Sequence, residues 1–142
     1  MATDEARTFQ VAATGDGIRQ AVDAFTQFTS GGTLTQEEVW KVQVALGEWL
    51  TNVVEHGYDG QPGGVIDVRY CLTGSDLEVS VTDDGRAFDP LTVPPPDTSA
   101  PIEDRKPGGL GIYFIRTLVD RVDYYRSGGR NTLVLAKRIS SQ

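Results

Sequence analysis

Cysteine and histidine are almost absent from this 142-residue sequence, which contains only Cys71 and His56. A single cysteine excludes a disulfide within the chain. No cluster of thiols or imidazoles exists to bind zinc, so a metal site would have to use oxygen ligands. Cys71 lies in an alternating apolar stretch, and we expect it to be a small buried hydrophobic residue rather than a reactive thiol.

Long apolar runs and an excess of basic residues are also missing. No segment approaches the roughly 18 apolar residues of a membrane span, and the N-terminus has no apolar run. We therefore expect a cytoplasmic protein without a membrane partner. The 13 Lys and Arg residues are outnumbered by 20 Asp and Glu residues, giving a net charge of −7. Without a basic stripe, direct binding to nucleic acid is not expected.

The length predicts a single domain over residues 1–142, because a chain of this size can bury a sizeable core. Hydrophobic periodicity predicts that this domain is of the α+β class. Asp16 is expected to cap the first helix, and Thr35 with Glu38 matches a capping box for the second. The expected strands are 7–13, 65–72, 76–83, 121–126 and 131–139, and the expected helices are 17–29, 36–56 and 112–120. This pattern predicts a two-layer sandwich, in which a largely antiparallel mixed sheet carries helices on one face.

The helix expected at 36–56 has an unusual polar face. Glu48, Asn52 and Glu55 are four and seven residues apart and would form one row, opposite an apolar stripe. Such a row is usually a solvated face. Here Trp49 and Val54 are among the apolar residues interleaved with it, so a ligand, a loop or a partner is expected to cover part of this side.

Two glycine-containing segments follow. In "DDGRAFDP" (83–90), Asp83 and Asp84 precede Gly85, which fits either an ordinary turn or a close approach of backbone to ligand. In "GGLG" (108–111), glycines open a helix, where free N–H groups and the helix dipole favour phosphate, although a flexible helix start would look the same. The P-loop, Rossmann and G-x-S-x-G hydrolase motifs are absent from the sequence.

The order of these features is more specific than any one of them. An E-x-x-x-N helix, a strand ending in D-x-G, a long irregular segment and G-x-G opening a helix together resemble the nucleotide-binding motifs of the GHKL superfamily, which has the Bergerat ATP-binding fold. "EWLTNVVEHGY", "DDGRAFDP" and "GGLGIYFIRTLVDRVDY" most resemble the stand-alone anti-sigma-factor serine/threonine kinases, over residues 8–138. Arg86 and Ala87 replace a second glycine common in the superfamily, which weakens the analogy with histidine kinases.

The resemblance implies roles for residues on the helix and strand. Asn52 would hold Mg²⁺ through its amide oxygen, and Glu48 would be the general base for an acceptor hydroxyl. Asp83 would accept a hydrogen bond from the exocyclic amine of adenine, and Gly85 would let the base lie against the backbone. Glu55 and His56 are expected to be structural, with His56 capping the end of the helix.

The resemblance also assigns the phosphate end of ATP. Backbone amides of the segment 108–111 would bind the phosphates, chiefly those of Gly109 and Gly111, together with Gly108 and Leu110. Residues 91–107 would form an ATP lid. Arg105 and Lys106 would either neutralise the γ-phosphate or form a solvated pair of charges on the lid.

The implied function is an ATP-binding anti-sigma factor with serine/threonine protein kinase activity. It would phosphorylate a STAS-type anti-sigma-factor antagonist, alternately sequester a sigma factor, and form a homodimer. Two alternatives remain open: a non-enzymatic, nucleotide-gated protein-binding module, and the catalytic half of a histidine kinase acting in trans. The second is disfavoured because the sequence shows no separate pair of dimerisation helices carrying a phosphorylatable histidine.

Overall fold

A computed structural model describes residues 5–30, 32, 34–61, 63–87 and 109–139 of the chain. The expected lid at 91–107, together with Arg105, Lys106 and Gly108, lies outside these residues.

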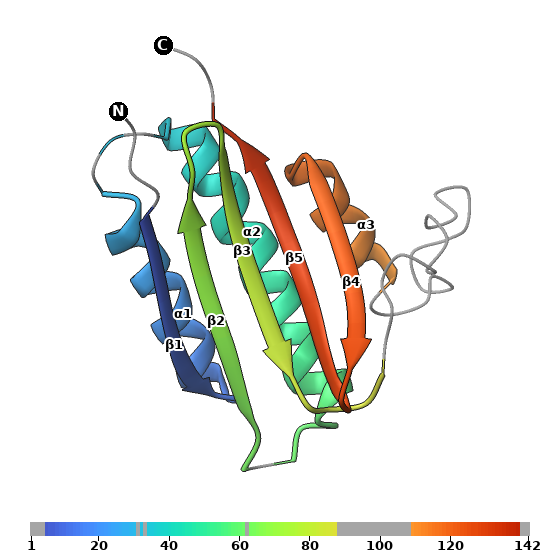
Figure 1. Cartoon of the computed structure of the whole chain (residues 1–142). Coiled ribbons are helices and arrows are strands. Elements are labelled where there is room, and N and C mark those ends of the chain that lie inside the picture. The colour runs from blue at the N-terminus through green and yellow to red at the C-terminus, as the bar shows by residue number, and fades with distance from the viewer. Residues whose placement is uncertain (1–4, 31, 33, 62, 88–108, 140–142) are drawn as a thin grey trace.

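The described strands form one five-stranded sheet in the order β1-β2-β3-β5-β4 (Figure 1). Every neighbouring pair in this sheet is antiparallel. The strands are β1 (Glu5–Ala12), β2 (Val65–Leu72), β3 (Asp76–Asp83), β4 (Arg121–Ser127) and β5 (Arg130–Arg138). The register pairs Asp83 at the end of β3 with Asn131 near the start of β5, so two polar residues 48 positions apart become neighbours.

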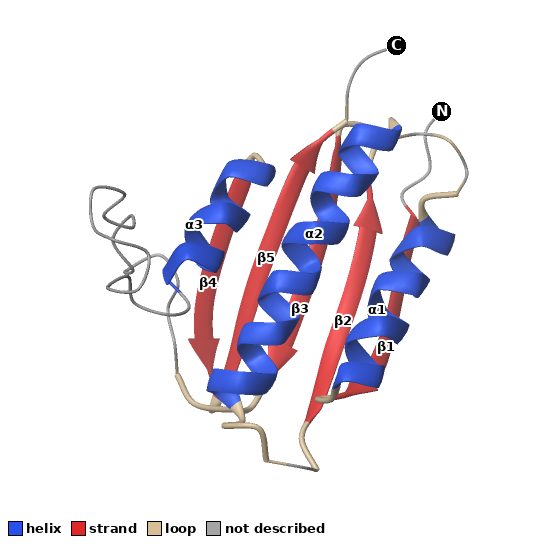
Figure 2. Cartoon of the chain, turned by 180° about the vertical axis from the view of Figure 1, so that it is seen from behind, coloured by secondary structure: helices blue, strands red, loops and turns tan. Residues whose placement is uncertain are grey.

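The helices α1 (Gly15–Phe28), α2 (Gln36–Asn52) and α3 (Gly109–Leu118) cover one face of the sheet, as Figure 2 shows. A π-helical segment, η1 (Val53–Gly57), continues from the end of α2. The predicted two-layer α+β architecture is therefore confirmed. In the described residues, no helix combines the length and the apolar character needed to cross a membrane.

The core lies between the helices and the sheet. Tyr70 on β2 is fully buried in the part of the core near β1 and α1. Its ring makes edge contacts with Phe9 and Phe25, with centroids 5.3 and 5.4 Å away. Its hydroxyl donates to the carbonyl of Ala21 on α1, and burial raises the pKa of this hydroxyl above its ordinary value. One buried aromatic residue thus fixes α1 onto the sheet through both packing and a hydrogen bond.

Several local predictions need correction. Thr14 caps α1, because its side chain accepts from the Gly17 N–H, and Asp16 lies inside the first turn. The capping box of Thr35 and Glu38 is confirmed. Helix α3 spans Gly109–Leu118 rather than 112–120. Cys71 is only half-buried, because it alternates with Tyr70 and lies on the sheet face that the helices leave open.

Candidate nucleotide-binding site

A small hollow lies where the end of α2, the end of β3 and the start of β5 meet. It brings together Asn52 and Asp83, which the sequence assigned to one site from positions 31 residues apart. Its lining residues are Trp49, Asn52, Val53, Gly57, Asp83, Arg86 and Asn131.

Asn52 is held in a defined orientation at this hollow. The residue is 7% exposed, and its Nδ2 donates to the backbone carbonyl of Glu48 at 2.9 Å. Because the amide nitrogen is engaged, Oδ1 is the atom that Asn52 can offer to a cation. A neutral amide oxygen at the edge of a hollow suits Mg²⁺, which accepts oxygen ligands and keeps several waters. The side chain of Glu48, one turn earlier, is exposed.

The predicted polar row of Glu48, Asn52 and Glu55 is divided in the structure. Glu48 and Glu55 are exposed, whereas Asn52 is buried. Trp49, expected on the polar side, is 3% exposed and belongs to the core. Helix α3 packs against α2. Another helix of the same chain therefore supplies part of the cover that was expected over the apolar residues on this side of α2.

The division of the row coincides with the π-helical segment η1. The Tyr58 N–H donates to the carbonyl of Val53 at 3.0 Å, a bond that spans five residues. A π-turn holds an extra residue, so it changes the direction in which the following residues point, and such turns are frequent at functional sites. Glu55 and His56 consequently face solvent, while Gly57 lies against the end of β3. His56 makes no side-chain hydrogen bond to the end of the helix in the residues that the structure describes, so the predicted cap is not observed.

Gly85 is fixed by a contact with Gly57 rather than by an unusual backbone angle. The N–H of Arg86 donates to the Gly57 carbonyl at 2.9 Å. A Cβ atom on Gly85 would lie 2.5 Å from the carbonyl oxygen of Gly57, closer than real Cβ atoms approach other atoms. The close approach of two backbones therefore requires glycine at this position.

The carboxylate of Asp83 is 2% exposed and oriented by two donors. Its Oδ1 accepts from the Gly85 N–H at 2.9 Å and from Asn131 Nδ2 at 3.0 Å. The bond to Gly85 closes an Asx-type turn, so the ordinary turn chemistry expected for this segment is present. Asp83 and Asn52 both line the hollow.

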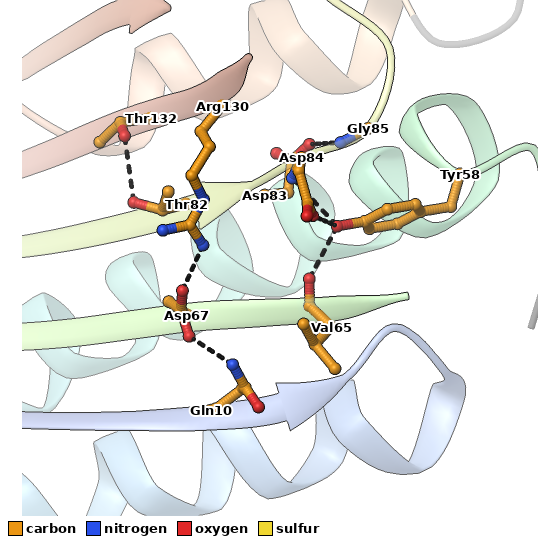
Figure 3. Close-up of polar contacts among 10 residues, drawn as sticks. All are labelled: Gln10, Tyr58, Val65, Asp67, Thr82, Asp83, Asp84, Gly85, Arg130 and Thr132. Atoms are coloured by element: carbon orange, nitrogen blue, oxygen red, sulfur yellow. Dashed lines mark hydrogen bonds and ion pairs between the residues drawn. The ribbon is translucent and has the colours of Figure 1, made fainter. Parts of the chain in front are cut away.

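Tyr58 connects the neighbouring Asp84 to the start of β2 (Figure 3). Its hydroxyl lies 2.7 Å from Asp84 Oδ1 and 2.7 Å from the Val65 carbonyl oxygen, and it accepts from the Asp84 N–H at 3.1 Å. Burial, reinforced by the Asp84 carboxylate, raises the pKa of Tyr58 to about 12. An exposed ion pair of Asp59 with Arg86, at 2.5 Å, lies on the same side of the loop.

Gly109, Leu110 and Gly111 form the first turn of α3. The first N–H groups of an α-helix have no partner within the helix, so this turn has the backbone arrangement that favours an anion.

Asn131 is the residue of this site that the sequence patterns did not reveal. It is 3% exposed and reaches Asp83 across the sheet. A signal was present: Asn131 shares its alternation with the buried Leu133 and Leu135, so a polar side chain was aimed at the helix side of the sheet. Its partner was not recognisable, because the pairing of β3 with β5 is a long-range feature.

Comparison with known proteins supports the resemblance to the GHKL superfamily. The family described as histidine kinase-like ATPase domain matches residues 11–137. The serine-protein kinase RsbW of Halalkalibacterium halodurans is 37% identical over 99 residues, which are 67% of this chain and 60% of the relative. The serine-protein kinase RsbW of Listeria monocytogenes is 30% identical over 139 residues, which are 95% of this chain and 88% of the relative.

A solved structure has the same fold. The crystal structure of the RsbU and RsbW domains of Rv1364c from Mycobacterium tuberculosis superposes with a TM-score of 0.65 at 20% identity, covering 97% of this chain and 33% of that one. The predicted superfamily is therefore confirmed by sequence and by fold. The chain belongs to the family of histidine kinase-like ATPase domains.

Proposed function

We propose that this chain is an ATP-binding anti-sigma factor with serine/threonine protein kinase activity. It transfers the γ-phosphate of ATP to a serine or threonine of a STAS-type anti-sigma-factor antagonist and alternately binds a sigma factor. The observation that carries the proposal is the meeting of Asn52 and Asp83 in one hollow, with the exposed Glu48 one turn from Asn52. Similar chains are named serine-protein kinases, which supports the same activity. In this proposal, residues 1–142 act as one domain, in a cytoplasmic homodimer.

The base end of ATP is assigned to the loop after β3. Asp83 accepts from the exocyclic amine of adenine, a contact that guanine, with a carbonyl at that position, does not offer. Gly85 belongs to the same end of the site: without a side chain it lets the loop pack against Gly57, and the base would lie against this loop. The two donors on Asp83 Oδ1 support this role because they fix the carboxylate while leaving its other oxygen for the ligand.

The phosphate end is assigned to α2 and to the start of α3. Asn52 would hold Mg²⁺ through Oδ1, and bound Mg²⁺ would neutralise phosphate charge. The amides of Gly108, Gly109, Leu110 and Gly111 contact the phosphates, and Arg105 and Lys106 on a lid at 91–107 neutralise the γ-phosphate. The first turn of α3 supports this assignment through its free N–H groups.

Glu48 takes the proton from the acceptor hydroxyl. The hydroxyl oxygen forms a bond to the γ-phosphorus, the bond between that phosphorus and the β,γ-bridging oxygen breaks, and ADP leaves. Positioning and charge neutralisation dominate such a transfer, so the protein needs little other covalent chemistry. The exposure of Glu48 supports the role, because its carboxylate must reach a residue of another protein.

The test is transfer from γ-labelled ATP to a purified STAS-type antagonist by the wild type and by Glu48→Ala. Loss of a general base should lower the transfer rate by about 100-fold or more, while ATP affinity stays the same. Glu55→Ala is the matched control, because Glu55 is also an exposed glutamate close to Asn52 but has no assigned role.

Three results would contradict the proposal. Equal transfer by Glu48→Ala and wild type would remove Glu48 from the reaction. Nucleotide-dependent binding of the antagonist without any transfer would identify a nucleotide-gated binding module instead. Label that is lost in acid would indicate phosphohistidine and a histidine kinase acting in trans, because phosphoserine and phosphothreonine survive acid.

A further inference from the structure

Asn131 is the centre of a hydrogen-bond network between β4, β5 and the loop after β3. Its Nδ2 donates to Asp83 Oδ1 at 3.0 Å and to the carbonyl oxygens of Gly85 and Arg86 at 3.3 and 3.0 Å. Its Oδ1 accepts from the Tyr124 hydroxyl at 2.5 Å and from Arg126 Nη1 at 2.8 Å. The amide thus faces three acceptors with its nitrogen and two donors with its oxygen.

This arrangement determines the orientation of the amide. A reversed amide would place its oxygen against the Asp83 carboxylate and two carbonyls, and its NH₂ group against two donors. The observed orientation also uses the whole hydrogen-bonding capacity of the side chain: its two N–H groups serve three acceptors, so one hydrogen is shared, and its two acceptor lone pairs face two donors. Asn131 is therefore unable to bind a ligand itself without giving up a contact inside the protein.

The contacts of Asn131 converge on the residue that would recognise the base. Asn131 Nδ2 and the Gly85 N–H both bind Asp83 Oδ1, so the carboxylate cannot rotate without losing two hydrogen bonds. Arg126 Nη1 additionally donates to the Gly85 carbonyl at 3.2 Å. Strand β4 thereby supports the loop at a second point.

We propose that Asn131, held by Tyr124 and Arg126, is a positioning residue for adenine recognition: it locks the Asp83 carboxylate so that Oδ2 faces the amino group of the base. The inference rests on the proposed ATP binding and extends it to residues on the β4–β5 hairpin. A hydrogen bond from a neutral amide is suited to this task because it adds no charge next to the carboxylate, whereas a lysine or arginine there would attract the oxygen meant for the ligand.

The test is Asn131→Asp, which keeps the size and shape of the side chain. The ionised carboxylate introduced by this substitution still accepts from Tyr124 and Arg126 but places a negative charge about 3 Å from Asp83. Among the residues that the structure describes, the charged and titratable side chains hydrogen-bonded to Asn131 are Asp83 on β3 and Tyr124 and Arg126 on β4. Arg126 favours the ionised form of the introduced carboxyl group. Two ionised carboxylates have no hydrogen between them, so the bond to Asp83 is restored only when the two groups share a proton.

We expect the ATP affinity of Asn131→Asp to be about tenfold lower than that of the wild type at pH 8.5, because a hydrogen bond to a charged group is lost. The affinity should recover towards the wild-type value as the pH falls to 5.5, since two close carboxylates share a proton at raised pKa. Calorimetric titration of the full chain with Mg-ATP at both pH values, beside the wild type, measures this. A merely structural defect would reduce affinity without recovery at low pH.

The outcomes separate this proposal from the proposed function. If the wild type binds no ATP, both fail. If the wild type binds ATP and Asn131→Asp binds equally well at pH 8.5, or binds weakly at both pH values, Asn131 does not position Asp83. Tyr124→Phe is a second, uncharged variant that removes one donor from Asn131 Oδ1. It should weaken ATP binding about threefold, and an unchanged affinity in this variant would also overturn the proposal.

Discussion

Replacing Gly85 by alanine tests how the loop after β3 is held against the end of η1. The Cβ atom of alanine would lie 2.5, 2.8 and 3.1 Å from the carbonyl oxygen, carbonyl carbon and Cα of Gly57. All three are backbone atoms, so no side chain can rotate out of the way. The two backbones must separate by roughly half an ångström or more for the contacts to become acceptable.

The separation has two costs that can be measured. Forcing a methyl group into a packed site typically costs about 1–3 kcal/mol, and the hydrogen bond from the Arg86 N–H to the Gly57 carbonyl, 2.9 Å long, is stretched. For a chain of this size, each kcal/mol lowers Tm by about 3–4 °C. We therefore expect Tm to fall by about 3–12 °C. Asp83 moves with the loop, so ATP affinity should fall as well.

The assay is a thermal melt followed by calorimetric titration with Mg-ATP below the transition. Two glycines provide matched controls. Gly47 lies within α2, and the Cβ of an alanine there would have nothing within 4 Å, so Gly47→Ala should raise stability by about 0.5–1 kcal/mol. Gly17 would place a Cβ 1.8 Å from the Ala12 carbonyl oxygen, away from the hollow. Gly17→Ala should therefore lower stability without lowering the ATP affinity of the folded protein.

The reasoning would be refuted by a Gly85→Ala variant that melts and binds ATP as the wild type does. A variant that is destabilised but binds ATP normally would refute the link between the Gly57 contact and Asp83, and would leave Gly85 with a purely structural role.

Two further variants probe the contacts shown in Figure 3. The hydrogen bond from Arg130, followed by that from Gln10, lowers the pKa of Asp67 below its ordinary value of 3.8, so its stabilisation exists above about pH 4 and is lost as pH falls through the lowered value. Urea unfolding should show Asp67→Asn less stable than the wild type by about 0.5 kcal/mol at pH 7, and the difference should shrink as the pH falls below 3.8 through the lowered pKa; a difference that does not change with pH would contradict this. Tyr58→Phe loses the hydroxyl between Asp84 and the Val65 carbonyl and should cost about 1 kcal/mol. Because the Tyr58 pKa is raised from 10.0 to about 12, this cost should shrink as pH rises through that interval, and a cost that is constant up to pH 12 would contradict it.

The elements of the fold were largely predictable because each is encoded by neighbouring residues. Alternation of apolar residues predicted the strands. The spacing of Thr35 and Glu38 predicted that α2 begins at residue 36, and the two reciprocal hydrogen bonds of this capping box are present. The N-cap of α1 was misassigned to Asp16 because Thr14 and Asp16 are both good capping residues and only the backbone angles distinguish them. The strand order was not predictable from local patterns, since β5 lies between β3 and β4.

Two candidate residues of the hollow were recognisable from the sequence, but the way in which the hollow is built was not. Asn52 and Asp83 were recognised from short motifs, and the structure places both in one hollow. The π-turn after Asn52 was missed because a hydrophobic pattern with a period of 3.6 residues does not report one extra residue in a turn. Asn131 was missed for a different reason: its role depends on a strand pairing 48 residues away.

The π-turn joins the part of the hollow at Asn52 to the part at Asp83. Asn52 belongs to α2, and Asp83 belongs to β3, so their separation depends on how the two elements are fastened together. Three contacts do this within a few residues: the backbone bond from Arg86 to Gly57, the hydroxyl of Tyr58 at Asp84, and the ion pair of Asp59 with Arg86. The ion pair is exposed and contributes little, so the glycine contact and the tyrosine carry most of the fastening. An uninterrupted α-helix would rotate the Gly57 carbonyl away from Arg86, and Asn52 and Asp83 would then be held by separate parts of the fold.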